Sequence, residues 1–566
     1  MKSIRKSMWV WLSLALIASL LGACAQPATP QVQIVEKTVQ VIETVIVQST
    51  AQVVEKLVTP TPETPQVGGT MVLTQYSEPT TLDQQLANGD LGMNMTRWLG
   101  STLLTYDQSG KLIGYLADSW ESTPDGLIWT FHLKKNVKFH NGEPLTADDF
   151  VYTIERTKAP DFSGLAQSNW EPVDKAEAVD PYTLKITLKN PFYPFLDNVT
   201  QFSAQPLNKK AVESAGADYG RHPIGVGPYK FKEWVQSQKV TLERNEDFNW
   251  GPAFAHAGPA YIQTLQFNIL PEPATIVAGL EAGEIDFSEI QAADINTFKN
   301  SDKYVVWQGP QTGIYPYVAI NTHEAPFDDV RVRQAFNWAV DREALIKVAA
   351  QGNAVVQYGP ISASVPGYWP GVEYIGYGYD LEKAKALMKD AGYTLNSAGM
   401  LEKNGQAFKV VMKMDSTDAT GDKTAEVLKE QYKALGVDIE LQQEEMGTFY
   451  ADLTAGKFTL GVPGLGYAND DLLYLMFHTG GAVNLGNYSD PVLDAMLEKM
   501  RTTIDPTAHN KVSADVQKYA VEHALVVPTF TAIETLVINP RIKGIVFIKG
   551  TDPRYAPQFF DAYISK

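Results

Sequence analysis

The chain has 566 residues, of which 44% are hydrophobic and 20% are charged, the composition of a globular protein with more than one domain. Its formal net charge of -18 argues against a nucleic-acid-binding protein, which needs a basic surface, and against extended electrostatic attachment to anionic lipid. Because the chain has a single cysteine, it forms no internal disulfide, and its stability must come from a large core.

The first 24 residues have the pattern of a secretory signal. Three basic residues lie among the first six, residues 8–23 carry no charge, and Leu-Gly-Ala directly precedes Cys24. This ending resembles the lipobox of bacterial lipoproteins, which implies cleavage before Cys24 and lipidation of its thiol. We therefore expect residues 1–23 to be a lipoprotein signal peptide and the mature chain to be tethered to the outer face of a membrane. The alternative is a short buried helix with a chance cysteine.

Residues 24–68 form a Pro/Thr/Val-rich segment. Pro/Thr-rich runs lie at 25–30 and 59–65, with a stretch of Val, Gln, Glu and Thr between them. Such runs are stiff and solvated, so we expect a spacer that lifts the folded part away from the membrane. Its middle could form a short strand or helix, and a minor role in binding a partner stays open.

From Gly69 onwards the sequence predicts a mixed α/β protein without internal repeats. Residues 71–76 predict a strand, and so do residues 128–134, where Trp129, Phe131 and Leu133 alternate with polar residues. Asn141-Gly142 predicts a turn.

Several helices are expected as well. Thr146 and Asp149 predict a capping box that begins a helix. Two later stretches have apolar residues at helical spacing, which predicts packing helices with one apolar face. These residues are Val332, Ala335, Phe336, Ala339 and Val340 in the first, and Val492, Leu493, Met496, Leu497 and Met500 in the second.

A series of motifs downstream of Gly69 resembles one protein family. The motifs are residues 116–126, 129–149, 223–229, 280–286, 321–331, 379–387 and 391–393. In this order they are similar to the family 5 extracellular solute-binding proteins, the dipeptide-, oligopeptide- and nickel-type receptors of ABC importers. Each motif alone is weak, but the set is specific. We expect the long motif at 116–149 to maintain the fold, because its aromatic residues would pack a small sheet and its acids would cap a helix.

The resemblance implies a two-lobed periplasmic-binding-protein-like α/β fold of the large class, with an extra subdomain in the first lobe. Mapped by motif order, residues 69–110, 222–312 and 530–566 form lobe I, residues 111–221 its inserted subdomain, and residues 313–529 lobe II. The two lobe crossings would be at 314–318 and 527–530, where a hinge must absorb closure.

The sequence lacks the motifs of common catalytic sites. It has no Gly-x-Ser-x-Gly, no His-Glu-x-x-His, no phosphate loop and no dinucleotide-binding fingerprint. Its eight histidines do not cluster, so no metal set is evident. Acid pairs such as Asp148/Asp149 are placed to start helices, which gives a two-carboxylate glycosidase site little support. We therefore expect neither catalysis, nor a cofactor, nor a bound metal.

Residues 464–471 are the first candidate for ligand contact. In peptide receptors of this family the matching region has a Trp-x-x-Asp-Tyr-like pattern, whose acid pairs with the amino terminus of the peptide. Here Tyr467 or a neighbour falls at the acid position, with Asn469, Asp470 and Asp471 just after it. A tyrosine would suit stacking on a sugar face or an apolar group, whereas an acid at 470 or 471 would keep peptides viable. The alternative is a solvated loop with helix-capping acids.

Other aromatic residues are weaker candidates. Tyr76 ends the first strand, which the family topology places near the cleft, and Tyr368 and Trp369 lie in a loop that resembles a cleft-lining loop of lobe II. Tyr315 and Tyr317 share a strand face near the hinge. Core or surface packing is the simplest role for each.

Together these features predict a membrane-anchored, extracytoplasmic receptor of an ABC importer. It would act as a monomer, capture a peptide or an oligosaccharide by lobe closure, and deliver the solute to a permease and ATPase complex. Two other classes stay open: a secreted lipoprotein enzyme such as a glycoside hydrolase, and a sensor lipoprotein that kept the fold but lost transport.

Overall fold

The computed structural model describes residues 41–43, 56–58, 64–87, 89–164, 166–549, 551 and 554–565. The expected signal peptide, Cys24 and most of the expected spacer lie outside this part. The chain divides into two units, 1–64 and 65–566. In the first unit, β1 (Val41–Glu43) pairs antiparallel with β2 (Lys56–Val58). The described helices include none that is both long and apolar enough to cross a membrane.

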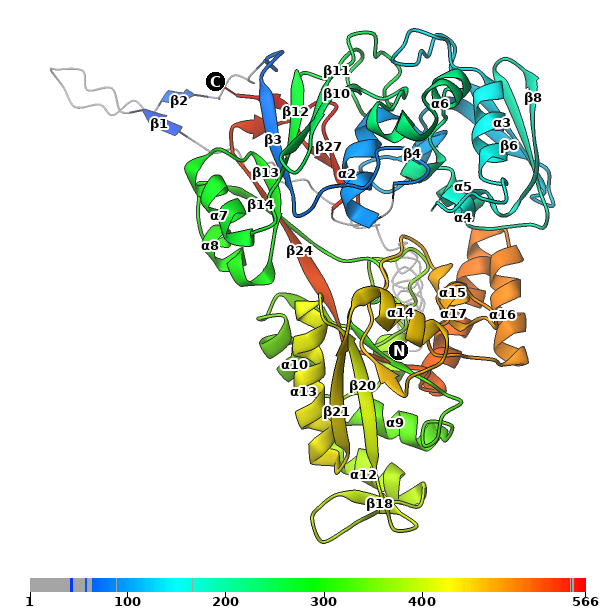
Figure 1. Cartoon of the computed structure of the whole chain (residues 1–566), viewed down its shortest axis with the longest axis vertical. Coiled ribbons are helices and arrows are strands. Elements are labelled where there is room, and N and C mark those ends of the chain that lie inside the picture. Colours follow the sequence, from blue (N-terminus) through cyan, green and yellow to red (C-terminus); the bar gives the residue numbers. More distant parts are fainter. Residues whose placement is uncertain are drawn as a thin grey trace, which may run out of the picture. The chain divides into compact units, whose positions relative to one another are not determined.

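Lobe I of the second unit is built on an eight-stranded mixed sheet (Figure 1). Its central strands β12, β3 and β13 run parallel, and β24 runs antiparallel to both β13 and β14. Along the sheet, the strands are β10 (Tyr229–Val235), β11 (Lys239–Arg244), β12 (Thr264–Ile269), β3 (Thr70–Gln75), β13 (Phe287–Ile290), β24 (Phe530–Ile538) and β14 (Val305–Pro310), with β16 (Ala354–Val356) paired to β24. The helices α2 (Gly89–Leu99), α7 (Pro273–Ala282) and α8 (Ile295–Lys299) belong to this lobe.

A smaller antiparallel sheet forms the inserted subdomain. Its strands follow the order β6 (Ala117–Ser122), β7 (Ile128–Leu133), β9 (Thr183–Leu188) and β8 (Val173–Asp180). The associated helices are α3 (Ala147–Arg156), α4 (Ala166–Trp170), α5 (Phe195–Asn198) and α6 (Lys209–Ala215). Trp129, Phe131 and Leu133 are all buried while their neighbours are half-buried, so the predicted one-sided strand is confirmed. The predicted capping box is also present, because the Thr146 backbone N–H donates to Asp149 at 2.8 Å.

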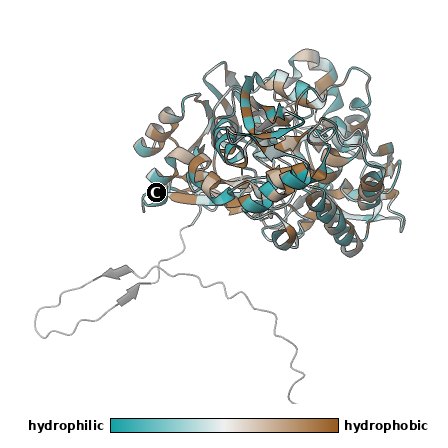
Figure 2. Ribbon diagram, turned by 90° about the horizontal axis from the view of Figure 1, so that it is seen from below, coloured by the Kyte–Doolittle hydropathy of each residue, from teal (hydrophilic) through white to brown (hydrophobic). Residues whose placement is uncertain are grey.

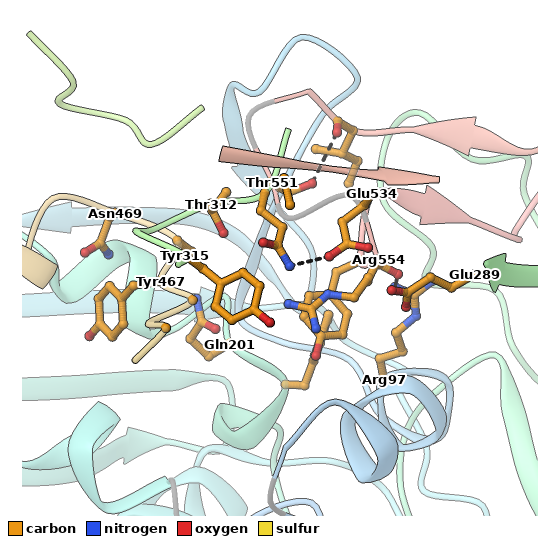
Figure 3. A pocket seen from close by; sticks show the side chains of 18 of the residues that line it. Arg97, Gln201, Glu289, Thr312, Tyr315, Tyr467, Asn469, Glu534, Thr551 and Arg554 are labelled. Carbon is orange, nitrogen blue, oxygen red and sulfur yellow. Dashed lines mark hydrogen bonds between the residues drawn. The ribbon is translucent and has the colours of Figure 1, made fainter. Parts of the chain in front are cut away.

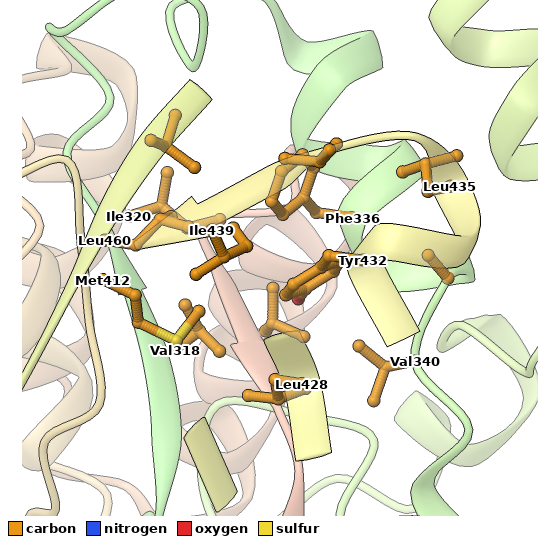
Figure 4. Close-up of a cluster of buried hydrophobic side chains, with 14 of the residues drawn as sticks. Val318, Ile320, Phe336, Val340, Met412, Leu428, Tyr432, Leu435, Ile439 and Leu460 are labelled. Atoms are coloured by element: carbon orange, nitrogen blue, oxygen red, sulfur yellow. The ribbon is translucent and has the colours of Figure 1, made fainter. Parts of the chain in front are cut away.

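Lobe II contains a five-stranded sheet covered by helices. The strands are β21 (Asp438–Glu444), β20 (Lys409–Asp415), β22 (Leu460–Gly461), β15 (Tyr317–Ile320) and β23 (Val526–Pro528). Helices α9 (Val330–Trp338) and α13 (Ala419–Leu435) supply much of the core in Figure 4, where Phe336 and Tyr432 have ring centroids 4.4 Å apart. The remaining helices are α10 (Arg342–Ala349), α11 (Val372–Ile375), α12 (Leu381–Asp390), α14 (Met446–Thr454), α15 (Leu472–Phe477), α16 (Pro491–Thr502) and α17 (Pro506–Glu522).

Helices form at both stretches with helical apolar spacing, as α9 and α16, but one residue expected on a buried face is exposed. In α16, Leu493, Leu497 and Met500 are buried, but Val492 is 60% exposed. Val492 lies in the first turn, next to the Asp490 side chain that caps the helix, and the helix turns it away from the core. Figure 2 shows the resulting pattern, in which helices carry both hydrophobic and hydrophilic stretches.

Apart from β16, which pairs only with the start of β24, the chain crosses between the two large sheets twice. The first crossing lies between β14 and β15, and the second at Thr529 between β23 and β24. The start of β24 stays in lobe II, because Phe530 packs in the core of that lobe and the next two residues pair with β16. β24 thus begins at the expected lobe border, residue 530, and stays extended from one lobe to the other (Figure 1).

Candidate functional site

A cavity of about 1350 Å³ lies between the lobes (Figure 3). Lobe I contributes Arg97, Asp197 and Glu289, and lobe II contributes Tyr315 and Asn469, among others. Residues from β24 and the C-terminal segment, such as Glu534, complete the lining. Its size exceeds the roughly 300–1,000 Å³ typical of small-molecule sites, so it has room for a ligand of several residues.

The topology explains why the lobe II lining residues meet. Strands β20 and β22 run parallel and adjacent, so the loops that follow them lie at the same edge of the sheet. Asp418 follows β20 and caps α13, where it accepts hydrogen bonds from the backbone N–H groups of Thr420 and Gly421. The loop after β22 supplies Tyr467 and Asn469. The Tyr315 hydroxyl donates to Asp418 at 2.6 Å and so joins the first crossing to this edge.

Arg97 is the most deeply buried cation of the cavity, with 9% of its surface exposed. It lies near the end of α2, above the ring of Trp98, and donates to the backbone carbonyls of Arg554 and Pro557. It forms no ion pair with any residue that the structure describes. Burial lowers the pKa of its guanidinium to about 9, because charging a buried group is costly.

Asp197 is the corresponding anion on the subdomain side. It accepts hydrogen bonds from the Tyr106 hydroxyl and, at 3.1 Å, from the Asn469 side-chain amide of lobe II. Burial raises the pKa of its carboxyl group, and the negative charge of Asp470 adds to this shift. Within the described part of the chain it has no ion-pair partner.

Two of the residues expected to contact ligand line the cavity. These are Tyr467 and Asn469, both of which Figure 3 labels. Tyr467 is half-buried and packs at the margin of a lobe II core cluster, and burial raises the pKa of its phenol. Asn469 is buried and uses its side chain to reach Asp197.

Asp470 and Asp471 do not line the cavity. Both are almost fully buried, and each has a side-chain partner: Asp470 lies 2.9 Å from a ring nitrogen of His509, and Asp471 accepts two hydrogen bonds of 2.6 and 2.7 Å from Arg501. Their carboxylates therefore point into the interior of lobe II and are already compensated.

Tyr76, Tyr368 and Trp369 also lie outside the cavity lining. The Tyr76 hydroxyl donates to the Glu289 carbonyl at 3.1 Å, so it holds the strand end that carries a lining residue. The Tyr368 hydroxyl donates to Glu373, and Trp369 packs in a small lobe II cluster. Tyr315 and Tyr317 differ in surroundings: Tyr315 lines the cavity, whereas Tyr317 is buried in a core.

The described side chains contain no group of three or more His, Cys, Asp or Glu arranged to hold a metal ion. The charged lining residues Arg97, Asp197 and Asp418 were not expected from the sequence. Arg97 and Asp197 lie outside the motifs, and only the folded chain brings them to the same cavity.

Comparison with known proteins identifies the family. The family model described as "Bacterial extracellular solute-binding proteins, family 5 Middle" matches residues 111–486. The chain is 30% identical over 452 residues to the glutathione-binding protein GsiB of Pectobacterium atrosepticum, covering 77% of this chain and 84% of that protein. It is 29% identical to the nickel-binding periplasmic protein of Escherichia coli, covering 79% and 86%.

Solved structures agree with the sequence matches. The oligopeptide-binding protein AppA from Bacillus subtilis, in complex with a nonapeptide, aligns with a TM-score of 0.73 at 25% identity over 89% of this chain and 100% of that one. NikZ from Campylobacter jejuni, in complex with Ni(L-His), aligns with a TM-score of 0.73 at 25% identity over 87% and 99%. The two-lobed fold and the family expected from the motifs are confirmed: this chain belongs to the family 5 bacterial extracellular solute-binding proteins.

Proposed function

We propose that the chain is the substrate-binding receptor of an ABC importer and that its solute is a peptide or a similar small zwitterion. Its relatives named for their ligands include proteins that bind glutathione, oligopeptides, nickel and heme. None of these supports the alternative of a secreted enzyme. The choice of a peptide over an oligosaccharide rests on the charges of the cavity.

The cavity lining contains charged residues of both signs in equal number. Its acids are Asp197, Glu289, Asp418 and Glu534, and its bases are Arg97, Lys423, Lys549 and Arg554. Of these, Arg97 and Asp197 have no ion-pair partner in the described chain, and charged groups that lose water in a closed site need partners of opposite charge, since a buried unpaired charge is costly. A zwitterionic peptide supplies both signs, whereas a neutral sugar supplies neither. This balance of charges is the observation that carries the proposal.

Two of the aromatic lining residues, Trp98 and Tyr115, favour the same choice. A sugar needs an open aromatic face, but one face of the Trp98 ring stacks on Phe559 with centroids 4.5 Å apart, and the Arg97 guanidinium lies 4.3 Å from its centroid. Trp98 is only 2% exposed. Tyr115 is also buried and packs edge-on against Phe560. These two rings are part of the cavity wall and offer little face for stacking.

Lobe closure is the proposed mechanism of capture. Two segments join the lobes, so the lobes can rotate about residues 311–316 and about the part of β24 just after Ala532, whose first three residues stay with lobe II. A ligand that contacts both lobes would bind the closed state more tightly than the open state. This difference in affinity would favour closure. A closed receptor presents both lobes to the permease in one arrangement.

We also propose that the receptor acts outside the cytoplasm as a monomer with a lipid anchor on Cys24, for delivery to a permease and ATPase complex. This rests on the sequence pattern before Cys24 and on the family. A single acyl chain binds membranes only marginally, so stable anchoring needs a second lipid chain or another signal.

A ligand panel tests the proposed function. Thermal unfolding would be followed with di- to pentapeptides and with cello-, xylo- and malto-oligosaccharides. A bound ligand at a hundredfold excess over its Kd stabilises the folded state by about 2.7 kcal/mol, so peptides should raise the Tm clearly and oligosaccharides should not. Scattering should show a smaller radius of gyration with the best peptide. A response to oligosaccharides alone would refute the peptide proposal, and binding without compaction would refute closure.

A further inference from the structure

We propose that Asp197 binds the ammonium group of the ligand, so that the anionic contact for the peptide amino terminus comes from the inserted subdomain of lobe I. This inference rests on the proposed peptide function and names the residue that recognises the amine.

The first step concerns which carboxylates in this region carry uncompensated charge. Asp471 is paired with Arg501. Asp470 is paired with His509, whose other ring nitrogen lies 2.9 Å from the Met500 carbonyl. A carbonyl only accepts, so that nitrogen donates, and the second nitrogen faces an acid. The Asp470–His509 pair is therefore either an ion pair or a neutral pair, and its net charge is zero in both cases.

Asp197 differs from these two acids. Its partners are the Tyr106 hydroxyl and the Asn469 amide, both of which are neutral. No lysine, arginine or histidine of the described chain lies within ion-pair distance of it. Asp197 also lines the cavity, unlike Asp470 and Asp471. Among Asp197, Asp470 and Asp471, it is thus Asp197 whose negative charge no cation of the described chain balances, so a cationic group of the ligand can balance it.

The other acids of lobe II and β24 are less suited to this role. Asp418 caps α13, a helix of 17 residues, so its charge is offset by the helix dipole as well as by its backbone and Tyr315 contacts. Glu534 also has a neutral partner, the Gln311 amide, but it lies on β24, and only Asp197 of the two is hydrogen-bonded across the lobes to Asn469. Asp197 lies in a helix of only four residues, so its charge has no comparable helix dipole to offset it.

The geometry gives the ligand a defined place. A carboxylate offers about four acceptor positions, and Asp197 uses two of them. An ammonium group has three donors, so it can occupy the remaining positions from the cavity side. Asn469 holds the carboxylate from lobe II, so this contact forms where the two lobes meet.

The test compares peptides that differ only at the amino terminus. The best tripeptide of the panel and its N-acetylated form would be titrated calorimetrically into the wild-type protein, Asp197→Asn and Asn469→Ala. Asp197→Asn keeps the size of the side chain and removes the charge. Asn469→Ala is the matched control, because it removes the interlobe hydrogen bond and leaves the carboxylate.

In the wild type the free-amine peptide should bind about 10- to 100-fold more tightly than the acetylated one, the range for a hydrogen bond to a charged group. Asp197→Asn should abolish this ratio, whereas Asn469→Ala should weaken both peptides and keep it. If the acetylated peptide binds the wild type equally well, the inference is overturned without any variant. A ratio that survives in Asp197→Asn overturns it as well. If the wild type binds oligosaccharides and no peptide, the proposed function itself has failed, and the inference falls with it.

Discussion

The ring of Tyr193 in the inserted subdomain stacks on the ring of His509 in α17 of lobe II, with centroids 3.5 Å apart and planes 11° apart. The Tyr193 backbone N–H also donates to the Arg501 carbonyl at 2.7 Å. Together with the Asn469–Asp197 hydrogen bond, these contacts join the lobes on the side of the subdomain, away from the two chain crossings. They are contacts that opening of the cleft must break.

Tyr193→Ala should therefore weaken closure for every ligand. An aromatic pair contributes about 0.5–1.5 kcal/mol beyond the area it buries, which corresponds to roughly a 2- to 10-fold loss of affinity. The loss should be the same for free-amine and acetylated peptides, because the ring does not contact the amine. Calorimetry measures it, and Tyr374→Ala serves as the control, since that tyrosine is 87% exposed. Unchanged affinity in Tyr193→Ala would show that the stack does not stabilise the closed state.

The sequence could predict the elements of this fold far better than its site. Trp129, Phe131 and Leu133 alternate along one strand, and Thr146 and Asp149 are three residues apart, so local spacing was enough to place them. Tyr467 and Asn469, which the loop at 464–471 suggests as ligand contacts, line the cavity. Asp197 and Asn469 are 272 residues apart, and no local pattern connects them. Asp470 is buried against His509 of α17, and Asp471 against Arg501 of α16. The sequence of the loop alone does not reveal these partners.

Asp471→Ala should reduce stability more than it changes ligand preference. The substitution leaves the Arg501 guanidinium without its carboxylate, and breaking a buried pair costs about 3–5 kcal/mol. Because the Arg501 side chain is 22% exposed and can reach water, we expect a smaller cost of about 2 kcal/mol in the free energy of unfolding. Urea unfolding would measure it, with Asp515→Ala, an exposed residue of α17, as the control. A stable variant that lost only peptide binding would instead place Asp471 in the ligand site.

Arg97→Gln should weaken binding of ligands that carry a carboxylate. Arg97 is a buried cation of the cavity without an ion pair in the described chain, and a charge-assisted bond to a ligand carboxylate is worth about 10- to 100-fold in affinity. Peptides with a free carboxyl terminus should lose this amount, and their amides should lose little.

The control for Arg97 is Lys423→Gln, which removes a cavity cation that is exposed and already paired with Glu426. Its effect on both ligand forms should be small. Arg97→Lys should restore part of the preference for the free acid, because the charge returns without the planar fork. Equal losses for acid and amide in Arg97→Gln would indicate that Arg97 only holds the C-terminal segment through the carbonyls of Arg554 and Pro557.

His140 should make the stability of lobe I depend on pH. Its Nδ1 accepts from the Gly225 backbone N–H at 3.2 Å and its Nε2 donates to the Gly227 carbonyl, so it joins two of the family motifs in its neutral form. Burial lowers its pKa from 6.5 to about 3. Between these values the unfolded state binds more protons than the folded state, so this contribution is complete above pH 6.5 and is lost as the pH falls towards 3.

The loss from His140 should be about 1.5 kcal/mol between pH 6.5 and pH 5. Urea unfolding at these two pH values would show it in the wild type, and His140→Gln should reduce the difference. His132→Gln is the matched control, because that histidine is partly exposed on β7. If both variants keep the pH dependence of the wild type, other groups are responsible for it.

Cys24→Ser should release the protein from membranes without changing its folded part. The thiol of Cys24 is the only one in the chain, so replacing it by a hydroxyl removes the proposed acceptor of the lipid. Expression in a bacterial host followed by fractionation would show the wild type in the membrane fraction and the variant in the soluble extracytoplasmic fraction. Both forms should bind the same peptide with the same Kd, since the cavity is built entirely from residues beyond 96. Continued membrane association of Cys24→Ser, with normal ligand binding, would show that the chain is held there by something other than a lipid on this residue.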